Sequence, residues 1–134
     1  MRWLFVTVSV LLFAGCGNVD WFPTGTTANT SAPVAFTFPQ LTNVVINTAV
    51  QSAQVTVIGD NQSGWPITVS DGTAGANSQY SINGAAFTNT AGTILPNQTL
   101  RIQQTSASTN STFATSNVTV GTYSTTFQSL TASQ

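Results

Sequence analysis

The chain has 134 residues, enough for one domain, and 41% of them are hydrophobic while only 4% are charged. Its charged side chains are two arginines and three aspartates, namely Arg2, Asp20, Asp60, Asp71 and Arg101. Nucleic-acid binding, which needs a row of cations, and catalytic triads that contain His or Lys are therefore excluded.

Residues 1–15 have the order of a secretory signal peptide. Arg2 supplies a positive charge, residues 3–13 are apolar apart from two hydroxyl residues, and the small residues Ala14 and Gly15 follow. The apolar run is shorter than the roughly 20 residues that a membrane-spanning helix needs. The pattern therefore predicts a cleaved leader and an exported protein.

The only cysteine follows this leader directly. Residues 12–16, Leu-Phe-Ala-Gly-Cys, resemble the lipobox of bacterial lipoproteins, in which the thiol accepts a diacylglycerol and cleavage makes the cysteine the new N-terminus. Phe13 stands where that family usually has Leu, Val or Ile. The resemblance implies that Cys16 is lipidated and anchors the protein to a membrane, and Gly17 resembles the pattern of lipoproteins sorted to the outer membrane. The alternatives are an ordinary signal peptide with a chance cysteine, or a free thiol.

Residues 16–33 are expected to form the acylated cysteine and a flexible tether. They are rich in Gly, Thr, Asn and Pro and show no sustained periodicity. Trp21 and Phe22 interrupt this composition. We expect them to dock on the domain or at the lipid interface, with ligand contact as the alternative.

From residue 34 to residue 134, short alternating runs separated by turn residues predict one all-β domain. Strands are expected at 34–38, 54–58, 66–70, 79–82, 85–88, 99–104, 117–120 and 122–127, with a short apolar patch at 44–46. Asn83-Gly84 lies between two of these runs and is the strongest local hairpin signal. No window after the leader has helical periodicity. About seven or eight strands at this spacing predict an antiparallel β-sandwich.

Strand parity predicts which residues form the core of this sandwich. The expected inward positions are Phe36, Phe38, Val55, Val57, Ile67, Val69, Tyr80, Ile82, Leu100, Ile102, Val118, Val120 and Phe127. Leu130 breaks the parity of Phe127, so a bulge or a strand end is expected there. Because the chain has a single cysteine, an immunoglobulin-type sandwich here must fold without its disulfide.

Several blocks of the sequence resemble an immunoglobulin-like repeat found in exported surface proteins of environmental bacteria. The blocks are VTVIG at 55–59, PITVSDGT at 66–73, YSINGAAFTNTAGT at 80–93, NQTLRIQQTSAS at 97–108 and NVTVG at 117–121. The resemblance implies an immunoglobulin-like sandwich that serves as a spacer, stalk or adhesion element without catalytic residues. Such repeats often stand in tandem arrays, whereas this chain carries one copy behind its expected anchor.

The remaining chemistry is limited to oxygen ligands and aromatic rings. Asp60 and Asp71 are the candidates for acid–base work or for Ca²⁺, but both stand beside turn residues, where aspartate is a common turn former. Ligand sets for zinc, copper or haem are missing. The sequence therefore predicts a protein with no catalytic activity, no metal and no cofactor.

Three aromatic residues, Trp65, Tyr80 and Tyr123, are candidate ligand contacts, and Phe87 could also expose its ring. Exposed rings beside amide side chains would form a sugar platform, whereas the alternative for Trp65 is a lid over the end of the core. Outer strand faces rich in Thr, Ser and Gln lack the lysines that protect sheet edges. A sheet edge, for example residues 122–130, could therefore pair with a second copy.

These observations predict a lipid-anchored module of the bacterial cell envelope that has a structural, adhesion or binding role. The membrane is its expected partner through Cys16, and a protein or a glycan is its expected soluble partner. The alternatives are a subunit of a self-assembling envelope complex or filament, and a carbohydrate-binding module.

Overall fold

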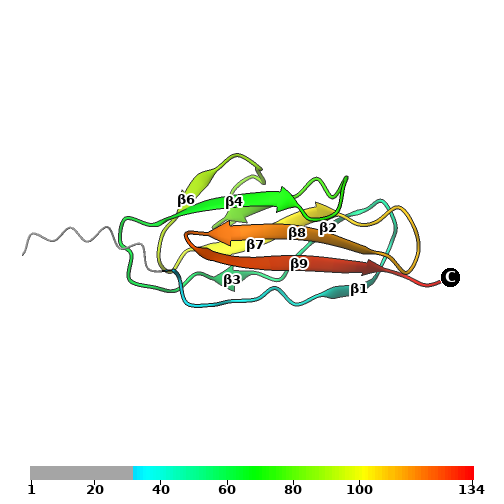
Figure 1. The fold of residues 1–134 in the computed structure, drawn as a ribbon, viewed down its shortest axis with the longest axis horizontal. Coiled ribbons are helices and arrows are strands. Elements are labelled where there is room, and N and C mark those ends of the chain that lie inside the picture. Colours follow the sequence, from blue (N-terminus) through cyan, green and yellow to red (C-terminus); the bar gives the residue numbers. More distant parts are fainter. Residues whose placement is uncertain (1–31) are drawn as a thin grey trace, which may run out of the picture.

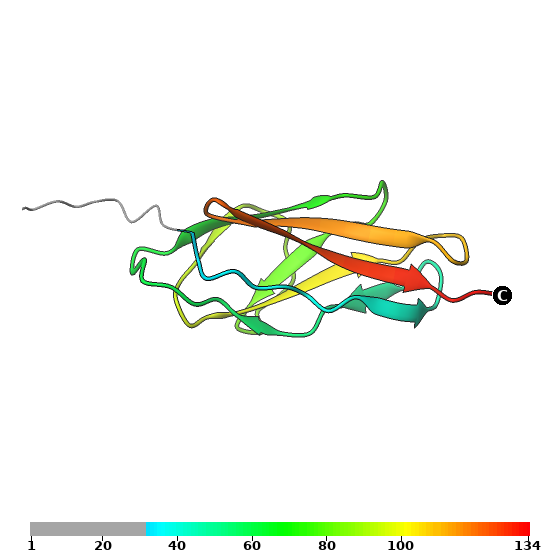
Figure 2. The same cartoon turned by 60° about the horizontal axis from the view of Figure 1, so that its bottom comes forward.

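The alternating runs form strands, and the strands form two sheets packed face to face (Figures 1 and 2). The computed structural model of the chain describes residues 32–134, so Cys16, the leader and most of the tether lie outside the described part. Within residues 32–134 the secondary structure consists of nine strands, which confirms the all-β prediction. No helix in this part is long and apolar enough to cross a bilayer.

The first sheet contains five strands in the order β1–β9–β8–β4–β6. The strands are β1 (Leu41–Val44), β4 (Trp65–Asp71), β6 (Gly92–Ile94), β8 (Phe113–Val120) and β9 (Tyr123–Thr131). β8 and β9 pair along their whole length through a tight turn at Gly121, which has φ +61°. β1 runs parallel to β9, and Asn43, with φ +57°, interrupts its register. Such an irregularity blunts an edge strand against further pairing.

The second sheet is built around one central strand. Its strands are β2 (Ala49–Gln51), β3 (Val55–Thr56), β5 (Gln79–Ile82) and β7 (Thr99–Thr105). β2 and β3 follow each other along one edge of β7, and β5 pairs with the other edge. The register shifts by one residue between β2 and β3. At this bulge the buried Ser52 hydroxyl accepts a hydrogen bond of 3.0 Å from the Ile102 N–H.

The apolar core lies between the sheets and contains the side chains that parity predicts. Its buried members are Phe38, Val57, Trp65, Ile67, Tyr80, Ile94, Leu100, Ile102, Val118, Val120 and Phe127. The other expected positions, Phe36, Val55, Val69 and Ile82, are half-buried and pack against this cluster. All thirteen expected core positions are therefore confirmed.

The buried part of the domain also contains a network of polar side chains. The buried Gln104 side chain of β7 donates hydrogen bonds of 2.9 Å from Nε2 to the Ala114 carbonyl and to the Ser129 hydroxyl. The Ser116 hydroxyl donates a 2.6 Å hydrogen bond to Gln104 Oε1 and lies 2.7 Å from the Ser78 hydroxyl. This Gln104 network joins the second sheet to β8 and β9 of the first.

The expected strand at 34–38 does not form. The segment is extended, but its one backbone link to a strand region is the Val34 N–H, which donates to the Ile58 carbonyl. Phe36 and Phe38 still pack edge to face, with ring centroids 5.8 Å apart. Prolines flank the segment at 33 and 39 and lack the N–H that a ladder needs. The alternation of apolar and polar residues at 34–38 therefore indicates which side chains are buried, but it does not indicate that the segment pairs with a sheet.

The expected hairpin at residues 79–88 forms only in part. Asn83 and Gly84 have φ +51° and +75°, and the Ala85 N–H donates to the Ile82 carbonyl across the turn, as the Asn-Gly signal predicts. Residues 85–88 are not a strand and meet β5 through a single bridge between Tyr80 and Thr88. The short strands β2 and β6 were not predicted, because three residues carry too little alternation to be recognised.

Of the two expectations at Leu130, the bulge is wrong, whereas the pairing of β9 with β8 does end at Leu130 and the strand itself ends at Thr131. β8 and β9 pair without a register break, from the pair Val120 and Tyr123 beside the turn to the pair Phe113 and Leu130 at the other end. Leu130 lies on the outer face opposite Phe113, and the buried positions of β9 continue from Phe127 to Ser129 and Thr131. β1 pairs with β9 only at Ser129 and Thr131, so among residues 32–134 no strand pairs with the rest of β9 on the side away from β8. The inward face of β9 continues through the polar residues Ser129 and Thr131, which parity from apolar residues alone does not reveal.

Candidate functional site

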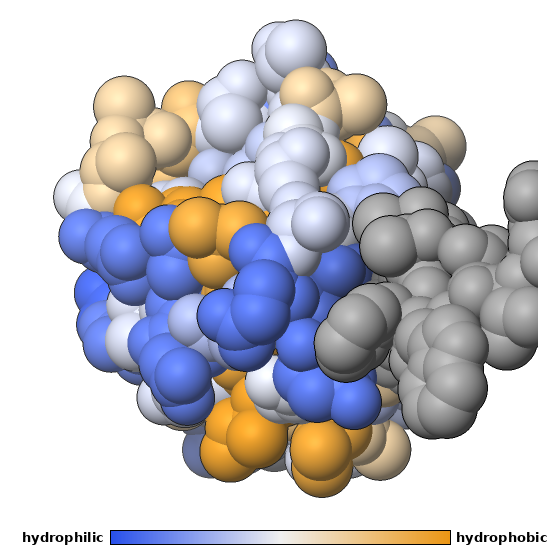
Figure 3. Space-filling model, turned by 90° about the vertical axis from the view of Figure 1, so that its left-hand side faces the viewer, coloured by the Kyte–Doolittle hydropathy of each residue, from blue (hydrophilic) through white to orange (hydrophobic). Residues whose placement is uncertain are grey.

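The structure places the three aromatic candidates in or against the core. Trp65 and Tyr80 are 1% and 4% exposed, and the hydroxyl of the half-buried Tyr123 donates a 2.5 Å hydrogen bond to the Phe36 carbonyl. Trp65 is the first residue of β4. Figure 3 shows the end of the sandwich at which β4 begins in Figure 1, where hydrophilic residues gather in the centre and hydrophobic ones form separate areas around them. The three rings do not form an exposed platform, and Trp65 is a lid over the core.

The two aspartate candidates are separated by β4. Asp60 precedes this strand and Asp71 ends it, so roughly 20 Å of extended chain lies between them. The Asp71 carboxylate accepts hydrogen bonds from the N–H groups of Ser78, at 2.7 Å, and Asn77, at 3.1 Å. It therefore fastens the loop between β4 and β5. Among residues 32–134, no three His, Cys, Asp or Glu side chains lie close enough together to hold a metal ion.

The pKa of Asp71 makes this loop contact dependent on pH. Hydrogen bonding from the hydroxyl and N–H of Ser78, and then from the Asn77 N–H, lowers the pKa of the carboxyl group below its ordinary value of 3.8. A lowered folded-state pKa adds stability above the unfolded-state pKa, and this stability is lost as the pH falls through the folded-state pKa.

We expect Asp71→Asn to lower the free energy of unfolding at pH 7 by about 0.5–1 kcal/mol, because the loop is exposed and solvent weakens the contact. The difference between parent and variant should shrink as the pH is lowered through and below 4. Urea unfolding of both proteins between pH 7 and pH 2 measures this difference. A difference that stays constant over this range would show that the carboxylate charge does not hold the loop.

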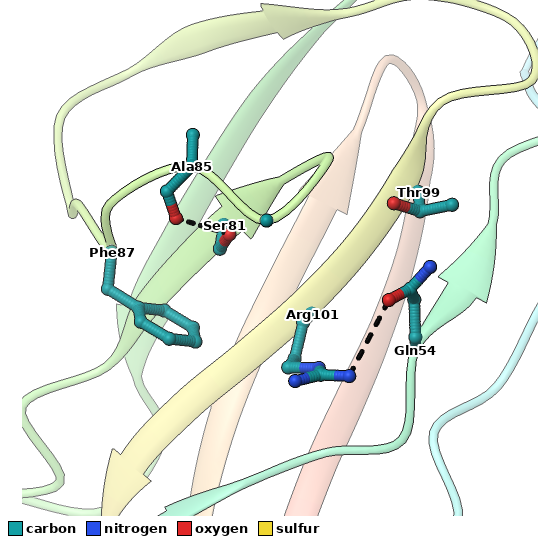
Figure 4. A pocket seen from close by; sticks show the side chains of 7 residues that line it. Gln54, Ser81, Ala85, Phe87, Thr99 and Arg101 are labelled. Atoms are coloured by element: carbon teal, nitrogen blue, oxygen red, sulfur yellow. Dashed lines mark hydrogen bonds between the residues drawn. The ribbon is translucent and has the colours of Figure 1, made fainter.

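A different site lies on the outer face of the second sheet, where Arg101 borders a cavity of about 120 Å³ (Figure 4). Arg101 points outward because its neighbours Leu100 and Ile102 occupy the inner face of β7. The cavity walls come from β7, from β5 and the turn after it, and from the bulge between β2 and β3. The lining residues are Gln54, Ser81, Gly84, Ala85, Phe87, Thr99 and Arg101.

Arg101 is the only cation in residues 32–134, and it has no carboxylate partner there. Its Nη1 and Nη2 donate long hydrogen bonds, of 3.4 and 3.5 Å, to the side-chain oxygens of Gln51 and Gln54. Its Nε is buried and has no acceptor in the described part of the chain. A buried donor without an acceptor costs about 1–3 kcal/mol, so this geometry calls for an explanation.

A row of glutamines crosses the sheet beside Arg101. The Gln51 amide donates a 3.0 Å hydrogen bond to Gln103, and the Gln103 amide donates one of 3.4 Å to Gln79. The three residues stand on β2, β7 and β5, so the row spans all three strands at this level. The outer face therefore offers one cation beside a line of amides.

No protein-family model, curated protein or solved structure matches this chain.

The chemistry of the site must therefore be inferred from its own residues. The Arg101 cavity can hold a single anionic group, since guanidinium donors match carboxylate and phosphate oxygens. A second hollow of about 320 Å³ lies beside Asp71, Asn77 and Ser78, but there the loop already supplies the donors that the carboxylate accepts.

The sequence prediction missed Arg101 and its surroundings. A lone arginine forms no motif, and Gln54 and Phe87 are far from it in the chain. One signal was available, because the alternation of Leu100 and Ile102 already places Arg101 on the outer face of its strand. Phe87 was among the rings that could be exposed, and the structure makes it a half-buried wall of the cavity.

Proposed function

We propose that this protein is a lipid-anchored, non-catalytic module of the bacterial cell envelope that displays one immunoglobulin-like domain to a partner. The position of the only cysteine carries the proposal, since Cys16 follows a charged start, an apolar run and two small residues. The Cys16 thiol would lose its proton and accept the diacylglyceryl group of a phospholipid, with the C–S bond forming as the C–O bond to the phosphate headgroup breaks and the headgroup leaves. The resulting thioether would hold the chain at a membrane. The predicted tether between Cys16 and the domain would then link the membrane anchor to the sandwich.

The order of the strands supports an immunoglobulin-like sandwich. In the first sheet the neighbours β9, β8 and β4 correspond to strands G, F and C of that fold. In the second sheet β7 corresponds to strand E. Its neighbours on one side, β2 and β3, together correspond to strand B, and its neighbour on the other side, β5, corresponds to strand D. One departure concerns β6, which lies beside β4 like an added C′ strand but follows β5 in the chain. The buried network of Gln104, Ser116 and Ser129 links the sheets in a chain that has no second cysteine.

Mass spectrometry of the mature N-terminus tests the anchor. We expect residues 1–15 to be absent and Cys16 to carry the mass of a diacylglycerol. A Cys16→Ser variant should move from the membrane fraction to the soluble envelope fraction, whereas a neighbouring Asn18→Ser variant should stay with the membrane. An unmodified Cys16 thiol in the mature protein, or a leader that is retained, would contradict the proposal.

A further inference from the structure

We propose that the Arg101 cavity binds the carboxylate of an acidic sugar residue in a glycan. This inference rests on the proposed function, because it names what the displayed domain recognises. The first argument is electrostatic. Arg101 stands at the centre of a sheet face rather than at an edge, it has no carboxylate partner within residues 32–134, and its buried Nε lacks an acceptor. A ligand carboxylate would accept hydrogen bonds from Nη1 and Nη2 of Arg101, which Gln51 and Gln54 hold only at 3.4 and 3.5 Å.

The charge of the site favours a carboxylate over more highly charged groups. Arg101 is the only cation in the described domain, and the side chains that surround the cavity are neutral. Phosphate and clustered sulfate groups bring more negative charge, and their sites gather several cations or helix N-termini. One guanidinium group matches one carboxylate per sugar residue. The glutamines hold the guanidinium with long hydrogen bonds, which a ligand can displace at small cost.

The size of the cavity indicates how such a ligand would lie. At about 120 Å³ it is smaller than the roughly 300–1,000 Å³ of sites that enclose a whole small molecule. It therefore admits the acidic group and part of one ring, while the rest of the chain continues over the sheet. Phe87 offers an apolar wall for the C–H face of a sugar ring, and Thr99 and Gln54 offer a hydroxyl and an amide (Figure 4).

The glutamine row gives the remainder of a glycan a polar surface. Gln51, Gln103 and Gln79 present amide donors and acceptors on neighbouring strands, about 4.8 Å apart. Sugar hydroxyls can donate hydrogen bonds to these amides and accept hydrogen bonds from them, and no charged group is needed. A peptide partner would be expected to use apolar pockets for its side chains, and Phe87 is the one aromatic residue in the wall of this cavity. The observations therefore favour a glycan.

The test is isothermal titration calorimetry of the mature acylated protein, in nonionic detergent micelles, with tetragalacturonate and with its carboxyl-reduced, neutral counterpart. We expect the acidic oligosaccharide to bind at least about tenfold more tightly than the neutral one, because only the former pairs with Arg101. Binding should also weaken as salt is added. Equal affinity for the two oligosaccharides, or no binding of the acidic one, would overturn the inference.

Variants assign the binding to the cavity. Arg101→Gln should lose about tenfold or more in affinity for tetragalacturonate, and Arg101→Lys should recover only part of it, because lysine keeps the charge and lacks the planar fork. Phe87→Ala should weaken binding, whereas Phe113→Ala removes an exposed ring from the opposite sheet and should leave it unchanged. Parent-like affinity of Arg101→Gln would overturn the inference.

Two further measurements separate the alternatives. A neutral glycan carrying sulfate groups and a peptide carrying glutamates should both bind more weakly than tetragalacturonate, and equal or tighter binding of either would overturn the choice of ligand.

Arg101→Gln should unfold at the same or a higher temperature than the parent, since it removes a buried donor without an acceptor. Lost binding in a folded variant then reports on the site. The N-terminal mass of the same sample shows whether the anchor proposal holds independently.

Discussion

Replacing Gln104 with alanine is expected to lower the free energy of unfolding by about 3 kcal/mol. Gln104 reaches from β7 across the sandwich to the Ala114 carbonyl and to the hydroxyls of Ser116 and Ser129. Alanine removes the partner of the Ser129 hydroxyl and one partner of the Ser116 hydroxyl, which keeps only its contact with Ser78. It also opens a cavity, because Gln104 is only 1% exposed. Each buried polar group that loses its partner costs about 1–3 kcal/mol, and the cavity adds to this loss.

The neighbouring residue provides a matched control. Gln103 has the same side chain and stands one position earlier on the same strand, but it points to the outer face and bonds only to Gln51 and Gln79. We expect Gln103→Ala to change the free energy of unfolding by about 0.5 kcal/mol or less. Urea unfolding followed by circular dichroism compares the two variants directly.

A second substitution separates packing from hydrogen bonding. Gln104→Leu restores most of the side-chain volume but none of the hydrogen bonds, so it should remain about 2 kcal/mol less stable than the parent. If Gln104→Leu were as stable as the parent, the Gln104 network would not hold the two sheets together. An apolar side chain would then serve equally well at this position.

Replacing Trp65 with alanine is expected to cost about 3–5 kcal/mol, a large share of the 5–15 kcal/mol that stabilises a typical domain. The indole ring closes the end of the apolar core under the loop at Gly59 and the turn at Gly121. A Cβ atom on these glycines would lie only 2.6 and 2.8 Å from the ring, so the turns have closed tightly around it. Neighbours held this closely cannot collapse into the space that the ring leaves.

Phe113→Ala is the matched control for the loss of an aromatic ring. Phe113 is 45% exposed on the outer face of β8, where its ring covers no core. We expect this variant to lose less than about 1 kcal/mol. Circular dichroism is again the appropriate probe, because Trp65→Ala changes the fluorescence that would otherwise be followed. A loss from Trp65→Ala no greater than that from Phe113→Ala would contradict the role of Trp65 as a lid.

The asparagine content of the chain also becomes intelligible in the structure. Five asparagines adopt positive φ at turns or irregular positions, namely Asn43, Asn47, Asn77, Asn83 and Asn97. Asparagine tolerates this region better than other residues with a side chain, because its short amide can bond to the local backbone. The turn at Asn83-Gly84 was predictable because glycine follows directly. The positive φ of Asn43 was not, since Asn43 lies at the register shift between Leu41 and Val44 of β1, which no neighbouring glycine marks in the sequence.

The sequence by itself determined the properties that depend on neighbouring residues. The leader that directly precedes Cys16 predicts an anchor, and the charge inventory excludes whole classes of chemistry. Two-residue alternation predicts the core positions, including Leu100 and Ile102 on either side of Arg101. Alternation has this power because the two faces of a strand differ in burial wherever the strand lies in the sheet.

Only the tertiary structure decided which polar residues are buried and which distant residues meet. Gln104 and Ser129 have the inward parity of Ile102 and Phe127, but their polar side chains gave no reason to count them among the core residues, and they meet across the sandwich in a hydrogen bond. Arg101 obtains its cavity from Gln54 and Phe87, which lie on separate segments of the chain. The physical reason is that a polar group can be buried once it has a partner. That partner is supplied by the packing of the two sheets, which no local pattern in the sequence encodes.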